Sequence, residues 1–226
     1  MPEMDERVAI QQPLSAIAET FEELSKRNNA NEIRLDTFCQ AASLVSVLFR
    51  SLGLAFKFAE LEYVAKRLNS EPQIKFATKR VNVHELHGLL EASKTCSTLP
   101  DILNLDVASD TVKTSGSFSR NLRRVRQGLD LVRAIFEQLL STDDSSLKEV
   151  ASTAYGQVCA PYHTWAVRTA VYAGMYTLPT RDQLLMKLNE TEQSADKKMR
   201  RYIAASLPII EYIDKLYLAR NITLDW

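Results

Sequence analysis

Residues 118–140 read FSRNLRRVRQGLDLVRAIFEQLL, a stretch whose apolar residues recur at the spacing of an α-helix. Within it, Arg120 and Arg124 stand four positions apart, so a helix places both guanidinium groups on one face. Two planar groups of N–H donors aimed the same way suit a phosphate. From these residues alone, two alternatives stay open: a phosphate site, or a solvated basic face that also includes Arg123 and Arg126.

Helical periodicity dominates the rest of the chain. Residues 95–117, which are rich in Ser, Thr and Asp, predict mostly loop. We therefore expect an all-α protein that forms a single domain over residues 1–226, with a core at about 14–217. Helices are expected over residues 14–27, from a cap at Asp36 to 49, over 82–94, 118–140 and 147–175 with a break near Pro161, after a cap at Thr180, and over 191–218 with a disturbance at Pro208.

Composition narrows the class of protein. The chain has 226 residues, of which 46% are hydrophobic, so it can bury a sizeable core. Its 28 basic residues balance 28 acidic ones, which gives no reason to expect nucleic acid as a partner. Three cysteines without paired spacing, Cys39, Cys96 and Cys159, predict reduced, buried thiols in a cytosolic protein. No signal peptide or bilayer span is apparent in the pattern.

The sequence lacks the common catalytic and cofactor motifs. Its 6 glycines form neither a P-loop nor a dinucleotide-binding fingerprint. His84 and His87 could share a metal, but no third ligand has suitable spacing, so a surface or capping role is favoured. We expect no catalytic residue, no metal and no cofactor.

Two other polar features stand out. Glu62 and Lys66 have the spacing of a salt bridge along a helix, which is the favoured reading of that pair taken alone. His163 lies between Tyr162 and Trp165, and taken alone it is a hydrogen-bonded histidine at a helix end. The two aromatic residues have apolar bodies and polar tips, which suit a membrane interface as well as they suit packing against the core.

Taken together and in order, four segments resemble the glycolipid transfer protein family. They are SLGLAF at 51–56 leading to Glu62 and Lys66, RNLRRVRQGL at 120–129, YHTW at 162–165, and AGMYTLPT at 173–180. The likeness is stronger to the plant accelerated-cell-death branch, which is similar to ceramide-1-phosphate transfer proteins; FAE at 58–60, YVAK at 63–66 and AP at 160–161 carry it. The resemblance implies a two-layer sandwich of helices that holds lipid chains between its layers.

The resemblance also implies roles for individual residues. Glu62 would hold the sphingoid amide and hydroxyl, and His163 would donate to the acyl-amide carbonyl. Lys66, Arg120 and Arg124 would hold the phosphate. The sugar-selective branch has an asparagine where Lys66 stands and a tryptophan where Arg124 stands, so both positions point to phosphate. Glu62 is one methylene longer than the family's usual aspartate, which brings Lys66 and Arg124 within its reach as competing partners.

The implied function is non-vesicular transfer of a phosphorylated sphingolipid, foremost ceramide-1-phosphate, between membranes. We expect a cytoplasmic, non-enzymatic protein that touches membrane surfaces transiently, and its plant relatives connect it with programmed cell death. The alternative is a lipid sensor or adaptor of the same fold that acts through protein partners with weak or no lipid transfer. A helical enzyme acting on lipid phosphates is disfavoured, because no metal ligands or activated nucleophile accompany the arginines.

Overall fold

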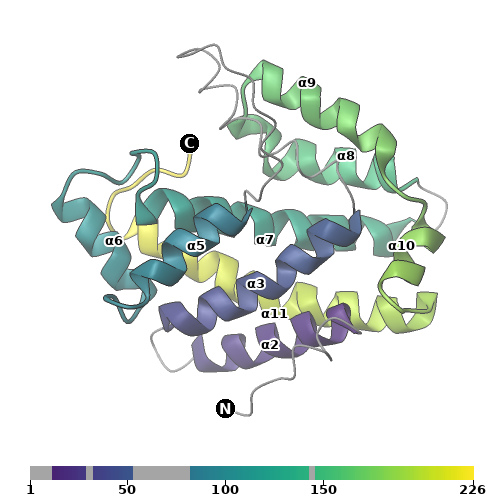
Figure 1. The fold of residues 1–226 in the computed structure, drawn as a ribbon, viewed down its shortest axis with the longest axis horizontal. Coiled ribbons are helices and arrows are strands. Elements are labelled where there is room, and N and C mark those ends of the chain that lie inside the picture. The colour runs from purple at the N-terminus through teal and green to yellow at the C-terminus, as the bar shows by residue number, and fades with distance from the viewer. Residues whose placement is uncertain (1–11, 29–32, 53–81, 143–145) are drawn as a thin grey trace.

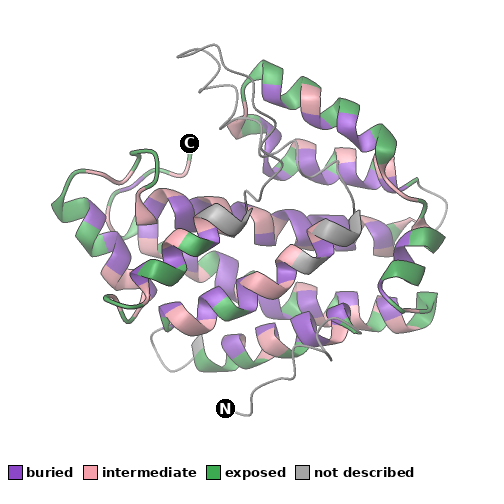
Figure 2. Cartoon of the chain, viewed as in Figure 1, coloured by how far each residue is buried: buried purple, intermediate pink, exposed green. Residues whose placement is uncertain are grey.

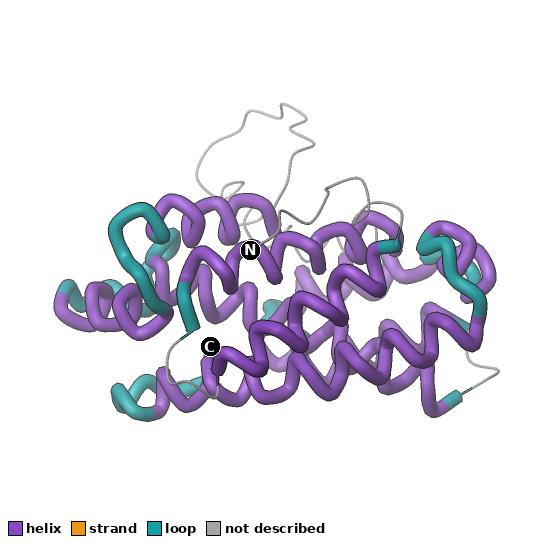
Figure 3. The backbone as a smooth tube through the Cα atoms, turned by 90° about the horizontal axis from the view of Figure 1, so that it is seen from below, coloured by secondary structure: helices purple, strands orange, loops and turns teal. Residues whose placement is uncertain are grey.

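The computed structural model describes residues 12–28, 33–52, 82–142 and 146–226. Their regular secondary structure is helical, and the only β feature among them is an isolated bridge between Arg34 and Thr98. In Figure 1, α3 and α5 cross in front of α7 and α11, and the turned view in Figure 3 separates the helices into stacked layers. The all-α prediction is confirmed. The helices are α2 (Pro13–Asn28), α3 (Leu35–Leu52), α5 (Asn82–Ala92), α6 (Leu99–Ala108), α7 (Phe118–Ser141), α8 (Leu147–Val158), η2 (Ala160–Tyr162), α9 (Trp165–Gly174), η3 (Met175–Thr177), α10 (Arg181–Lys187) and α11 (Glu192–Leu218).

The two longest helices, α7 and α11, pack against each other and carry much of the core. Many of their residues are buried, as the purple segments in Figure 2 show. Phe21 of α2 meets Tyr202 of α11 edge to face at 5.1 Å between ring centroids, and Tyr202 meets Phe136 of α7 at 5.5 Å. The Tyr202 hydroxyl also donates to the Leu129 carbonyl at 3.1 Å. This aromatic stack joins α2, α11 and α7.

The first turn of α7 is held at several points. The Ser117 hydroxyl accepts the Arg120 N–H at 3.2 Å, as an N-cap does. The buried Ser119 N–H donates to the Asp106 carboxylate of α6 at 2.6 Å, and the Tyr217 hydroxyl of α11 donates to the Ser119 carbonyl. Because the beginning of α7 is fixed in this way, the face that each position along the helix presents to its neighbours is also fixed.

The prediction of loop over residues 95–117 is wrong for α6. Thr98 and Asp101 form a capping box: the Thr98 hydroxyl accepts the Asp101 N–H at 3.4 Å, and the Asp101 carboxylate accepts the Thr98 N–H at 2.8 Å. Leu103 lies in the helical turn that follows this cap, and its side chain is fully buried. Polar residues such as these are common in loops, but here they cap and stabilise the beginning of a helix.

At Pro208, where the sequence predicts a disturbance, α11 continues without ending. Proline lacks the N–H that would bond the carbonyl of Ala204, four positions earlier. Ala204 is exposed, so water can satisfy that carbonyl. By contrast, the break near Pro161 and the cap at Thr180 are confirmed.

Two smaller predictions differ in detail. Asp36 lies inside the first turn of α3 instead of capping it, and its carboxylate accepts the Thr37 N–H at 2.6 Å. All three cysteines are free thiols, but Cys96 is only partly buried, whereas Cys39 and Cys159 are buried. Among the helices that the structure describes, none is long and apolar enough for a bilayer span.

We expect Phe21→Ala to lower the free energy of unfolding by about 3–5 kcal/mol, because it removes a fully buried ring and leaves a cavity beside Tyr202. Urea denaturation measures the change. Leu207→Ala is the matched control, since Leu207 is 41% exposed on α11 and its truncation should cost only about 0.5 kcal/mol. Equal losses in both variants would contradict this account of the core.

Candidate functional site

Arg120 and Arg124 lie one turn apart on α7 and are both half-buried. The Arg120 Nη1 donates to the carbonyl oxygen of Lys113 at 3.2 Å. The Arg124 Nη1 donates to the side-chain oxygen of Gln127, also at 3.2 Å. Each guanidinium is therefore oriented by a fixed acceptor, and the four-residue spacing puts both on one face of a regular helix.

Gln127 is a site candidate that the sequence analysis missed. Its side chain is 4% exposed, and its oxygen accepts from Arg124. Its side-chain nitrogen has no hydrogen-bond partner among the residues that the structure describes. A buried amide N–H without a partner costs free energy, which a ligand oxygen could recover. The sequence did contain a signal for this residue: Gln127 follows Arg124 by three positions, which places the two side chains next to each other on a helix.

His163 directly follows η2, and a buried tyrosine holds its ring. Its Nδ1 lies 2.7 Å from the hydroxyl of Tyr155, which is 1% exposed on α8. When the tyrosine hydroxyl donates to Nδ1, the ring proton belongs on Nε2. The histidine is then prepared to donate from Nε2 to a carbonyl oxygen, which is the role that the family resemblance implies for it.

Two observations bring the arginines of α7 and the His163 segment together. The Arg123 guanidinium lies over the Tyr162 ring, 5.4 Å from its centroid. Burial raises the pKa of the Cys159 thiol to about 12, and the positive charge of Arg124 opposes that rise, so Cys159 is within electrostatic reach of Arg124. Arg123 therefore contacts the segment that carries His163, and Arg124 lies near the beginning of that segment.

The two aromatic residues beside His163 differ in their surroundings. Trp165 is 74% exposed at the start of α9, where the Thr164 hydroxyl caps the helix by accepting the Val167 N–H. Tyr162 is half-buried against Arg123. The exposed indole has the access that membrane contact needs, and the membrane role of both residues stays a prediction.

Glu62 and Lys66 lie outside the residues that the structure describes, so their roles also stay predictions. Within the described ranges, the structure contains no cluster of His, Cys, Asp and Glu that could hold a metal.

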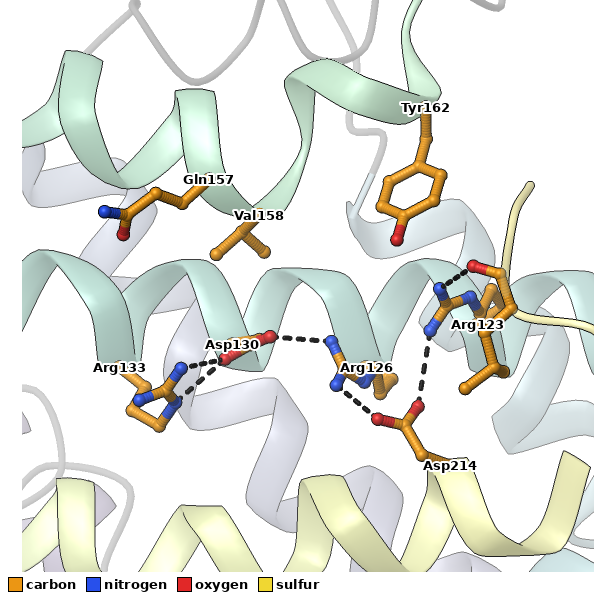
Figure 4. Close-up of a pocket in the computed structure, with 9 residues that line it drawn as sticks. Arg123, Arg126, Asp130, Arg133, Gln157, Val158, Tyr162 and Asp214 are labelled. Atoms are coloured by element: carbon orange, nitrogen blue, oxygen red, sulfur yellow. Dashed lines mark hydrogen bonds and ion pairs between the residues drawn. The ribbon is translucent and has the colours of Figure 1, made fainter. Parts of the chain in front are cut away.

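A cavity of about 300 Å³ lies between α7, α8 and α11, on another face of α7 (Figure 4). Its walls carry a chain of ion pairs. Asp214 of α11 bonds Arg123 at 3.3 Å and also Arg126, and Asp130 bonds Arg126 and Arg133, both at 2.7 Å. Arg123 is 3% exposed, and burial, followed by the neighbouring charge of Arg126, lowers its pKa. The alternative of a solvated basic face is therefore wrong for Arg123 and Arg126.

Comparisons with known proteins agree with this architecture. The family model for glycolipid transfer protein matches residues 33–190. An ACD11 homolog protein of Arabidopsis thaliana is 62% identical over 222 residues, which cover 95% of this chain and 89% of that protein. Accelerated cell death 11 (ACD11) of the same plant is 42% identical over 217 residues, covering 95% and 96% of the two chains.

Solved structures give the same result for the fold. The crystal structure of a mutant of Arabidopsis ACD11, complexed with C12 ceramide-1-phosphate, superposes with a TM-score of 0.82 at 40% identity, and the match covers 95% of this chain and 100% of that one. Sequence and fold agree over nearly the whole length, and the chain belongs to the glycolipid transfer protein family.

Proposed function

We propose that this protein transfers ceramide-1-phosphate between membranes without vesicles. The observation that carries the proposal is the pair Arg120 and Arg124, two oriented guanidinium groups on one face of α7. A phosphomonoester carries nearly two negative charges and several acceptor oxygens. Two arginines, joined by Lys66 as the resemblance implies, match that charge and that number of acceptors.

The nature of the ligand is further supported by the relatives. A mutant of Arabidopsis ACD11 has been crystallised with ceramide-1-phosphate, and ACD11 is 42% identical to this chain. Lys66 and Arg124 also stand where the sugar-binding branch has a neutral amide and an aromatic ring. A neutral hexose would leave these clustered positive charges uncompensated, so the site should reject it.

The lipid chains need an apolar compartment, because each CH₂ kept from water is worth about 0.8 kcal/mol. The structure has a small apolar gap of about 10 Å³ between α3, α7 and α10. Admission of a chain there would require α3 and α10 to separate from α7. The residues that line the gap are Leu48, Val132, Ile135, Phe136, Leu184 and Leu188.

We infer that residues 1–226 act as one domain in the cytoplasm, where the exposed Trp165 makes transient contact with membranes. Transfer by this route involves binding and release, without covalent chemistry. If the protein were instead an adaptor acting through protein partners, it would show weak or no lipid transfer.

We expect Arg124→Ala to lower ceramide-1-phosphate binding by about 1.5–3 kcal/mol, because it removes a charge-assisted contact to the phosphate. This corresponds to a roughly tenfold to hundredfold loss of affinity. Transfer between vesicles, followed by fluorescence, should fall accordingly, while the thermal midpoint of unfolding stays nearly constant.

Arg200→Ala is the matched control for this experiment, because Arg200 is an exposed arginine on α11 whose removal should leave transfer unchanged. A parallel loss of transfer and thermal stability in Arg124→Ala would identify a structural arginine. Absence of transfer by the unmodified protein would favour the adaptor.

We expect Glu62→Asp to maintain or improve transfer, because it restores the side chain that the family usually has at this position. Glu62→Gln should weaken transfer, since a carboxylate can accept from both amide and hydroxyl, whereas an amide offers one good acceptor. The same vesicle assay measures both. Unchanged transfer in both variants would mean that residue 62 does not contact the lipid.

A further inference from the structure

We propose that the segment after α11, here called the α11 tail (residues 219–226), positions the phosphate-binding arginines of α7. This inference rests on the proposed function, because it concerns the same headgroup site. The tail packs against the α6–α7 loop (residues 109–117), and that loop supplies the carbonyl that orients Arg120. No part of the tail belongs to the site as the sequence predicts it.

Lys113 is the link between the tail and Arg120. Its ammonium has three partners in the described part of the chain, and all three lie in the tail. It is 3.5 Å from the Thr223 hydroxyl, 3.9 Å from the Asp225 carboxylate and 5.6 Å from the centroid of the Trp226 ring. The carbonyl of the same residue accepts from Arg120. The tail therefore holds the residue whose carbonyl accepts from the Arg120 guanidinium.

A second connection runs through Arg123, the neighbour of Arg124. The Arg123 Nη2 donates to the backbone carbonyl of Leu224 at 2.7 Å, and its Nη1 bonds Asp214 at 3.3 Å. A buried guanidinium needs such partners, because an unpaired charge away from water is strongly unfavourable. The tail thus approaches the turn of α7 that carries both binding arginines.

The tail is itself anchored to the first turn of α7. The Trp226 indole N–H donates to the Thr223 carbonyl at 2.7 Å, and its ring meets Tyr217 edge to face at 6.3 Å. Tyr217 in turn bonds the Ser119 carbonyl. The Thr223 hydroxyl donates to Asp225 and holds the pKa of that carboxyl below its ordinary value, so Asp225 is ionised and able to attract Lys113 at neutral pH.

These contacts suit a positioning role better than a folding role. The Lys113 side chain is 57% exposed and that of Asp225 76%, and exposed ion pairs of this kind contribute little to fold stability. An arginine side chain, however, has many rotamers, and one that is already ordered loses less entropy when a phosphate binds. Removal of the tail contacts should therefore weaken ligand binding while the fold stays intact.

The test is a double-mutant cycle in the full chain, read as the dissociation constant for short-chain ceramide-1-phosphate. We expect Asp225→Ala combined with Trp226→Ala to raise that constant roughly threefold to tenfold, with an unchanged thermal midpoint. In an Arg120→Ala background the same two changes should have no further effect, because the residue that they position is gone.

Lys113→Ala should reproduce the loss, and Lys113→Arg should restore most of the binding. Lys94→Ala, which removes an exposed pair with Glu91 that has no part in the tail contacts, is the control.

Additive losses with and without Arg120, or no loss at all, would overturn the proposal. A fall in the thermal midpoint that accounts for the weaker binding would show that the tail only stabilises the fold, and this result would also overturn the proposal. If the unmodified protein binds no ceramide-1-phosphate, the proposed function fails, and the same cycle measured with inorganic phosphate decides the role of the tail. If the protein binds no inorganic phosphate either, both the proposed function and the positioning role of the tail are overturned.

Discussion

The capped beginning of α7 is the constraint on which the candidate site depends. Ser117 and the Asp106 carboxylate fix where the helix begins, and that fixes the neighbours toward which the face with Arg120 and Arg124 is turned. The surrounding elements are then placed relative to this helix. Tyr217 of α11 bonds its first turn, so the main partner helix is joined to it at the same end.

The ion pairs in the neighbouring cavity extend this organisation along α7. Burying Arg123 is costly because it removes a charge from water, and the low-dielectric surroundings strengthen its attraction to Asp214 in return. Such a pair adds little net stability, but a misplaced α11 would leave both charges unpaired. The network therefore makes one relative position of α7 and α11 much more favourable than others. In that position, Tyr162 packs on Arg123 and brings His163 to the arginine-bearing helix.

The parts of this structure that depend on local spacing could be predicted from the sequence. The helix over residues 118–140, the shared face of its two arginines and the cap at Thr180 follow from neighbours within a few positions. The helix α6 was missed because its polar capping residues have the composition of a loop. The burial of Arg123 was missed because its carboxylate partner, Asp214, lies 91 positions away on another helix. Contacts over such distances depend on packing, which the spacing of residues does not show.

The central claim is that the oriented arginines of α7 make the site selective for a phosphorylated sphingolipid. The most direct measurement is native mass spectrometry of the protein after incubation with vesicles that contain ceramide-1-phosphate and glucosylceramide in equal amounts. We predict one bound lipid per protein, with the mass of ceramide-1-phosphate, and little bound glucosylceramide. Equal capture of the two lipids, or preference for glucosylceramide, would contradict the assignment of Arg120 and Arg124 as a phosphate site.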